Sequence, residues 1–190
     1  RPEVERALGE QVQTNEIGRS VALLALSHWL AALGIREFSL LEIGSSAGLN
    51  LNFDRYSAIT PTGSMGATTS SVIFTPDWFD TPPPLSDTPA RCVARVGCDI
   101  SPLSPSEPDD SIRLQSFVWP DQTARMARLR GAIEIARSHP NLVVSESADS
   151  FLRERLDSSH GGATVVFHSI VWQYLPDQVR DGVREYVRIS

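Results

Sequence analysis

Short apolar runs alternate with amphipathic segments along most of the chain. The runs at 38–43, 92–98, 142–145 and 163–168 have the length and apolar content of buried strands. Between them, helical spacing or helix start signals mark the segments 49–57, 110–118, 120–139, 151–156 and 176–187. Because strands that alternate with helices form parallel sheets with right-handed crossovers, we predict an α/β fold with a Rossmann-like, mostly parallel sheet and flanking helices.

The first 34 residues are predicted to form a helical cap. Residues 2–13 indicate a polar helix or arm, and Thr14 or Asn15 can cap a helix that ends at Gly34. Apolar spacing predicts that one face of this helix is buried, and the face comprises Ile17, Val21, Leu24, His28 and Ala31. We expect His28 to be a packed structural histidine.

The remaining residues, 35–190, are predicted to form the core domain, with an irregular insertion at about 58–90. Proline and glycine punctuate short β-prone runs in that stretch, which predicts an insertion with a hairpin. The last residues, 186–190, continue a helical pattern without a stop signal, and residue 1 is an arginine. We therefore expect the chain to be part of a longer protein.

Charge and lysine content exclude several functions. The formal net charge is −6 and no block of basic residues occurs, which argues against nucleic acid as a partner. All 17 basic residues are arginine, so a Schiff-base lysine, a Walker-type phosphate loop and a Ser–Lys dyad are excluded within this sequence. The four histidines lack ligand spacing, so no metal site is predicted.

The cysteines and the absence of targeting signals indicate the compartment. Cys92 and Cys98 lie on one predicted strand, too far apart to form a disulfide, so we expect two core thiols. No apolar run is long enough to span a membrane, and no signal peptide is visible. We predict a cytoplasmic protein without a membrane partner; the oligomeric state stays open.

The stretch 38–50 carries the strongest functional signal. An apolar run leads into a turn that contains Gly44 and Gly48 and then into a helix-prone segment. Such a strand–turn–helix unit directs backbone N–H groups and the positive end of a helix dipole at one point, as in nucleotide-binding crevices.

Polar residues follow or end each predicted strand. Glu42 precedes Gly44, Asp99 ends the second strand, Asp149 follows the third and His168 ends the fourth. Because the carboxyl ends of parallel strands line one crevice, these groups are expected to converge. Asp99 has the chemistry to bind a ribose diol, Asp149 with the Ala148 backbone an adenine edge, and Glu42 an amino group or a water.

Aromatic and amide side chains near the expected mouth are candidates for a substrate wall. Two segments supply them, and their members are Trp119, Gln122, Trp172 and Tyr174. Asn15, Arg19, Asn50 and Tyr56 are further substrate candidates. The alternative for the tryptophans is that they fill the core.

The segment Leu41-Glu-Ile-Gly-Ser-Ser-Ala-Gly48 resembles motif I of class I S-adenosylmethionine-dependent methyltransferases. The resemblance implies a seven-stranded sheet and methyl transfer from S-adenosylmethionine to a small molecule. The cofactor contacts that it places on this chain are Glu42, Gly44, Ser45, Ser46, Gly48, Asp99, Ile100, Ala148 and Asp149. His168 is the candidate base, because an unperturbed imidazole titrates near neutrality.

A second resemblance covers nearly the whole chain. The segments Thr14-Asn-Glu-Ile-Gly-Arg19, 41–50, 97–99, Phe117-Val-Trp-Pro-Asp-Gln122 and 167–174 are similar to a bacterial family known only as a domain of unknown function. That family implies no particular activity.

Two other functions stay open from the residues. Gly44-Ser-Ser46-Ala-Gly48 also fits the nucleophile elbow of α/β-hydrolases, with Asp99 or Asp149 and then His168 in the matching order. A non-catalytic nucleoside-binding module is the third hypothesis. The methyltransferase reading requires the insertion to account for the long gap between Gly48 and Asp99, since a compact dinucleotide unit has about twenty residues there.

Overall fold

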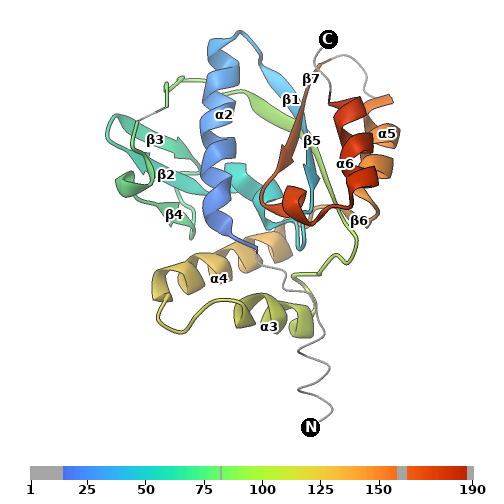
Figure 1. Cartoon of the computed structure of the whole chain (residues 1–190). Coiled ribbons are helices and arrows are strands. Elements are labelled where there is room, and N and C mark those ends of the chain that lie inside the picture. The colour runs from blue at the N-terminus through green and yellow to red at the C-terminus, as the bar shows by residue number, and fades with distance from the viewer. Residues whose placement is uncertain (1–14, 82, 158–161, 188–190) are drawn as a thin grey trace.

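A computed structural model describes residues 15–81, 83–157 and 162–187 (Figure 1). Its main sheet has four strands in the order β6-β5-β1-β7, and each neighbouring pair is parallel. Their bounds are β1 Glu37–Ile43, β5 Arg91–Asp99, β6 Val143–Ser145 and β7 Ala163–His168. The described residues thus contribute four strands to this sheet, fewer than the seven implied by the methyltransferase resemblance. The predicted α/β class with a parallel sheet is confirmed.

The central strand β1 is buried on both faces. Phe38 and Leu40 belong to a core shared with α2 (Ser20–Ala32) and α4 (Thr123–Ser138), whereas Leu41 and Ile43 belong to a core shared with α5 (Ala148–Asp157). This alternation follows from the two-residue period of a strand. Glu42 therefore falls in the same row as Phe38 and Leu40, a row that is otherwise apolar.

The helices form layers around the sheet (Figure 1). One side is covered by α2, while α5 and α6 (Asp177–Tyr186) pack together on the other side. Below them in the view, α3 (Pro108–Ser116) lies beside α4. Short 3-10 segments occur at η1 Ile17–Arg19, η3 Pro76–Trp78 and η4 Val171–Tyr174, and a longer, kinked one at η2 Leu49–Arg55.

The predicted insertion contains a small second sheet. Its strands are β2 Ser57–Thr60, β3 Gly63–Gly66 and β4 Ile73–Phe74, in the order β3-β2-β4. The helix predicted over 49–57 is wrong at its end, because Ser57 starts β2 and donates its N–H to the Val72 carbonyl. The part from Leu49 to Arg55 is 3-10 helix.

The N-terminal helix follows its predicted face. Ile17, Val21, Leu24, His28 and Ala31 are all buried. The Nδ1 atom of His28 accepts the Ser86 N–H at 3.0 Å, as expected of a structural histidine. The predicted arm at 2–13 and the cap at Thr14 lie outside the described residues.

The insertion holds the start of this cap through one tight contact. Trp78 packs so closely on Gly18 that a Cβ at Gly18 would lie 2.4 Å from two ring carbons. Trp78 in turn meets Phe74 edge-on, with 5.3 Å between ring centroids, and lies under the Arg128 guanidinium. The insertion, η1 and α4 are therefore packed as one group.

The start positions of three helices differ from the sequence prediction by two or more residues. The helix expected to be capped by Asp109 or Asp110 begins one residue before Asp109, and α4 begins at Thr123 rather than Pro120. A turn in which Gln122 donates to the Trp119 carbonyl occupies the intervening residues. The α5 helix starts at Ala148, so Asp149 lies in its first turn.

Both cysteines are free, as expected. Cys98 is buried, and burial raises the pKa of its thiol to about 12. Within the described ranges, no helix has the length and apolar character needed to cross a bilayer.

Candidate functional site

The turn after β1 has the conformation that its glycines predict. Gly44 and Gly48 have φ values of +70° and +65°, and Ser46 between them has φ +52°. The Ser45 N–H donates to the Cys98 carbonyl at 2.9 Å and the Gly48 N–H to the Ser45 carbonyl at 2.8 Å. The turn is thereby fixed to the end of β5.

Asp99 ties the same turn to the second strand end. Its Oδ2 accepts the Ser46 N–H at 2.8 Å and its Oδ1 accepts the Ser101 N–H at 3.0 Å. Asp99 is half-buried, while its neighbour Ile100 is 68% exposed. The structure thus brings together Asp99 and the glycine turn, as predicted from the strand ends.

Glu42 lies beneath this turn and is 2% exposed. Asn50 Nδ2 donates to Glu42 Oε1 at 3.4 Å, and Asn50 Oδ1 accepts the Ser20 hydroxyl at 2.7 Å. Glu42 Oε2 is buried and has no hydrogen-bond partner among the described residues. Burial raises the pKa of Glu42 to about 8, although Asn50 and Arg19 act in the opposite direction. The carboxyl group is therefore mostly protonated at pH 7.

The helical cap reaches the site through η1. Asn15 Nδ2 donates to the Ser45 carbonyl at 3.2 Å, and Arg19 Nη1 donates to the carbonyl and hydroxyl oxygens of Ser169 at 3.3 and 3.1 Å. Glu16 forms an ion pair with Arg125 of α4. Asn15 and Arg19, predicted as substrate candidates, thus lie beside the strand ends; Ser169 was missed, although it directly follows His168.

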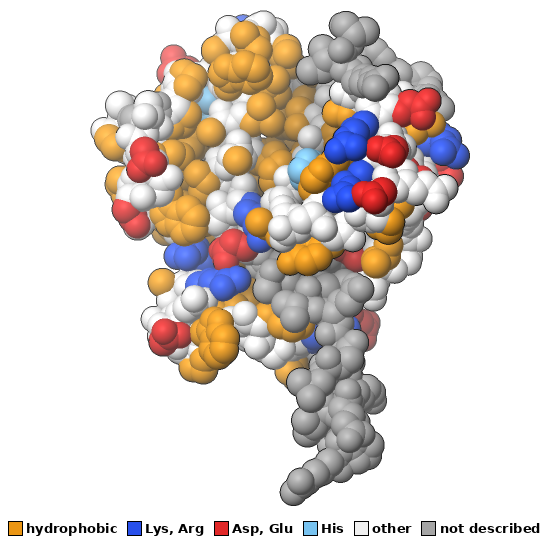
Figure 2. All heavy atoms as spheres, viewed as in Figure 1, with side chains coloured by type: hydrophobic (Ala, Val, Ile, Leu, Met, Phe, Trp, Pro, Cys, Tyr) orange, Lys and Arg blue, Asp and Glu red, His pale blue; other side chains and the backbone are white. Residues whose placement is uncertain are grey.

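His168 lies at the carboxyl end of β7 and is exposed. The His168 ring stacks on the Trp172 ring with 5.6 Å between centroids. The Arg184 guanidinium also lies over the Trp172 ring, 5.4 Å from its centroid. The two rings line a hollow of about 520 Å³ together with Val166, Val183, Arg184 and Val187. Figure 2 shows apolar side chains beside the basic and acidic side chains that gather over α6.

The loop after β7 closes on the glycine turn. A Cβ at Gly44 would lie 2.5 Å from Val171, so no side chain fits between η4 and the turn. Ile170, the residue directly before η4, has φ +68°, a conformation that is an outlier for a β-branched residue and costs about 1–3 kcal/mol. A ligand that reached Gly44 would have to displace Val171.

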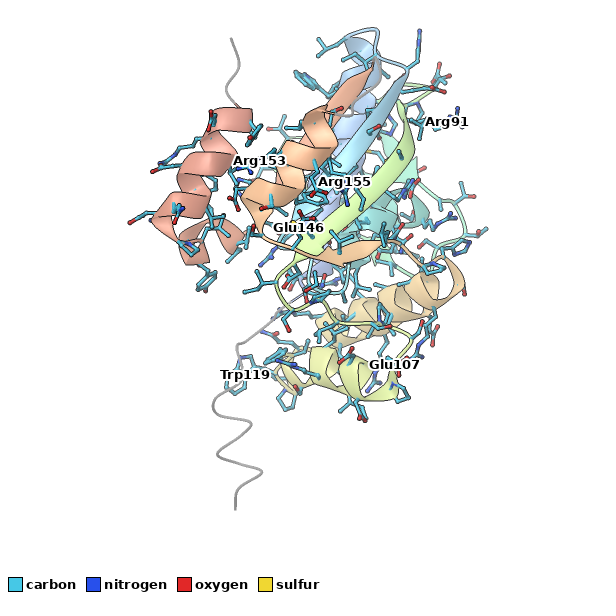
Figure 3. The ribbon with its side chains drawn as sticks, turned by 90° about the vertical axis from the view of Figure 1, so that its right-hand side faces the viewer. Arg91, Glu107, Trp119, Glu146, Arg153 and Arg155 are labelled. Carbon is cyan, nitrogen blue, oxygen red and sulfur yellow. The ribbon has the colours of Figure 1, made fainter. Side chains whose placement is uncertain are left out.

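Several predicted site residues lie elsewhere. Tyr56 is fully buried and its hydroxyl donates to the Leu49 carbonyl at 2.5 Å, so it belongs to the core. Trp119 and Tyr174 are 72% and 74% exposed, so neither fills the core. Figure 3 shows Trp119 at the α3–α4 connection, and Gln122 Oε1 accepts a bond from Arg125 there.

Ala148 and Asp149 lie in the layer formed by α5 and α6. Ala148 is buried in the core on that side, and Asp149 packs against Gly182, where an added Cβ would lie 2.8 Å from the Asp149 Cβ. Asp149 Oδ1 is buried without a partner among the described residues. The described contacts therefore do not join Asp149 to the glycine turn.

The hydrolase arrangement is not assembled here. Ser46 Oγ is buried and has no hydrogen-bond partner in the described part of the chain, so no bond links it to His168. A nucleophile elbow instead exposes its hydroxyl and places it within reach of the base. Within the same residues, no group of three or more His, Cys, Asp or Glu side chains has a metal-binding arrangement.

Fold and site define an α/β protein whose parallel sheet carries a glycine turn and a carboxylate at adjacent strand ends. The chain belongs to a family described as uncharacterized protein conserved in bacteria (DUF2332), which matches residues 1–188. This confirms the resemblance to a bacterial family of unknown function. Searches of curated proteins and of solved structures each returned no match.

Proposed function

We propose that this protein binds the adenosyl part of S-adenosylmethionine and transfers the methyl group to a small molecule. The observation that carries the proposal is the bond between Asp99 Oδ2 and the Ser46 N–H, 2.8 Å long, at the ends of adjacent parallel strands. It holds a carboxylate suited to a ribose diol beside a turn suited to close backbone approach.

The strand order supports the same function. Numbered along the chain, the four strands of the main sheet lie in the order 3-2-1-4, so the order reverses between β1 and β7. Dinucleotide-binding sheets share this arrangement, and their ligands bind outside the carboxyl ends of the strands at the reversal. The glycine turn, Arg19 and Ser169 all lie at this point.

The unpaired polar atoms around the turn fit a bound nucleoside with an amino group. Glu42 Oε2, Ser46 Oγ and Asn15 Oδ1 are all buried without partners in the described residues. Because unpaired buried polar atoms are rare in native proteins, a polar ligand is a reasonable partner for them. S-adenosylmethionine has such polar groups, and its electrophilic methyl group supplies the chemistry of the proposed transfer.

The protein's part in this reaction is positioning and proton handling. Val171 covers the turn at Gly44, so the part of the turn from Ser46 to Gly48, together with Asp99, would hold the nucleoside. Fixing the two reactants in line supplies much of the rate enhancement. The exposed His168 imidazole at the end of β7 would accept the proton of a hydroxyl or amine acceptor. Trp172, stacked on His168, would keep the ring in a defined orientation.

Replacing Asp99 with Asn is expected to weaken binding of S-adenosylhomocysteine about 10- to 100-fold, the effect of losing hydrogen bonds to a charged group. Isothermal calorimetry measures it. Asp109→Asn, in the exposed first turn of α3, is the matched control and should bind like wild type. Wild-type protein that shows no binding, or equal binding by both variants, contradicts the proposal.

A fluorophosphonate probe should leave Ser46 unlabelled, because its hydroxyl is buried and not bonded to a base. Mass spectrometry of the treated protein, with Ser46→Ala as the blank, identifies any adduct. Stoichiometric labelling that disappears in the Ser46→Ala variant would support the hydrolase instead.

A further inference from the structure

We propose that Arg19 forms a carboxylate-binding subsite at the reversal point of the sheet, with the Ser169 hydroxyl as a second donor. The inference rests on the proposed function, because it assigns part of the same ligand site. It specifies that the bound cofactor or the methyl acceptor presents a carboxylate to the end of β7.

The position of Arg19 is fixed by the two elements on either side of the site. Its Nη1 donates to Ser169 O and Ser169 Oγ, at the residue that follows β7. Its own backbone belongs to η1, which is held by the Trp78 contact at Gly18 and by the Glu16–Arg125 ion pair. The guanidinium group is therefore anchored on one nitrogen and held at a defined place.

Among the residues that the structure describes, no acidic side chain balances the charge of Arg19. In the described residues Arg19 forms no ion pair, and Glu16, the acidic group with the largest effect on it, pairs with Arg125. Glu42, the next acidic group, has a pKa of about 8 and is mostly neutral at pH 7. Figure 2 shows basic and acidic side chains meeting where the start of α2 approaches α4. Within the described part of the chain, one positive charge in this group therefore has no counter-ion.

Burial makes this unbalanced charge costly. Partial burial lowers the pKa of Arg19, and removal from water is the largest cause of that shift. Arginine stays charged in proteins, so an anion from solution or from a ligand is the way to offset the cost. The position thus favours a negatively charged ligand group.

The geometry of the guanidinium group selects a carboxylate. Nη1 is occupied by Ser169, whereas Nε and Nη2 form no hydrogen bond with the described residues. These two nitrogens lie on one edge and present parallel N–H groups, the arrangement that binds the two oxygens of a carboxylate. Ser169 Oγ accepts from Arg19, so its own proton is available to the same ligand.

Two sources of the carboxylate are distinguished by comparing how tightly wild type and Arg19→Gln bind four probes. The nucleoside probes are S-adenosylhomocysteine, which has a carboxylate, and 5′-methylthioadenosine, which lacks the amino-acid end. The acceptor probes are benzoate and its uncharged match benzamide, followed by ligand-observed NMR. Arg91→Gln is the control, because Arg91 lies at the amino end of β5, far from the site (Figure 3).

If the cofactor supplies the carboxylate, Arg19→Gln weakens the binding of S-adenosylhomocysteine about 10- to 100-fold and leaves the binding of 5′-methylthioadenosine unchanged. If the acceptor supplies it, both nucleosides bind normally, and benzoate binding seen in wild type is lost in Arg19→Gln. Arg91→Gln behaves like wild type in both cases.

The inference is overturned if Arg19→Gln binds all four probes like wild type, or if it weakens both nucleosides equally, which would indicate a general structural role. Failure of wild type to bind either nucleoside refutes the proposed function separately. The benzoate pair still decides the subsite in that case, and equal binding of benzoate and benzamide by wild type overturns it.

Discussion

The wild-type protein is expected to lose stability as the pH rises from 4.5 to about 8, and a Glu42→Gln variant should not show this loss. The pKa of the Glu42 carboxyl is raised from 4.5 to about 8 by burial in the folded protein. Over this interval the unfolded chain releases the Glu42 proton while the folded protein retains it. Folding therefore becomes less favourable as pH rises, and the loss is complete above about pH 8.

The expected size of this effect is large for a single residue. Each unit of pKa difference corresponds to about 1.4 kcal/mol, so the Glu42 contribution falls by about 3–5 kcal/mol across the interval. A Gln side chain has nearly the same shape and keeps an oxygen for Asn50, but it does not titrate. The variant should equal or fall slightly below wild type at pH 4.5 and exceed it at pH 8.5.

Urea unfolding at pH 4.5, 6.5 and 8.5 measures the difference in the free energy of unfolding between the two proteins. Glu37→Gln is the control, since Glu37 is an exposed carboxylate at the start of the same strand and pairs with Arg91. A Glu42→Gln variant whose stability relative to wild type is constant with pH would show that Glu42 ionises normally.

Gly44→Ala is expected to lower the free energy of unfolding by about 2–4 kcal/mol. Two causes add: Gly44 has φ +70°, and its added Cβ would lie 2.5 Å from Val171. Binding of S-adenosylhomocysteine should fall as well, because the turn must shift to accommodate the methyl group.

Two further variants separate the causes. Gly34 has a similar φ of +83°, and no atom lies within 4 Å of a Cβ added there. Gly34→Ala therefore measures only the cost in free energy of a positive φ at alanine. The double variant Gly44→Ala with Val171→Ala relieves the clash. Thermal and urea unfolding should show Gly34→Ala losing about 1–2 kcal/mol. Equal losses at the two glycines would mean that Val171 does not press on the turn.

Local patterns predicted most of the fold. The strand at 163–168 was predicted with its observed bounds, and the strand at 38–43 differs from β1 by one residue. Both are apolar runs between clear turn signals, so local sequence suffices to define them. The helix predicted at 49–57 was wrong only at its end, because Tyr56 and Ser57 bond to Ala67 and Val72, which a local pattern does not reveal.

The site was predictable only where it depends on strand ends. Asp99 and the glycine turn meet because parallel strands end at one edge, a rule that sequence order is enough to apply. The contact of Arg19 with Ser169 joins residues 150 positions apart, and Val171 closes on Gly44 across a similar interval. Only tertiary packing sets such contacts. Asp149 departs from expectation because it lies in the first turn of helix α5 and packs against Gly182.

The Gly18–Trp78 contact limits how this protein can be recombined with its relatives. The ring of Trp78 occupies the space that any larger residue at position 18 would need. A chimera that takes its insertion from one parent and its cap from another would therefore pack well only if the residue at position 18 of one parent leaves room for the residue at position 78 of the other. Exchanged together, the two segments should transfer as a unit, and Arg19 would travel with them.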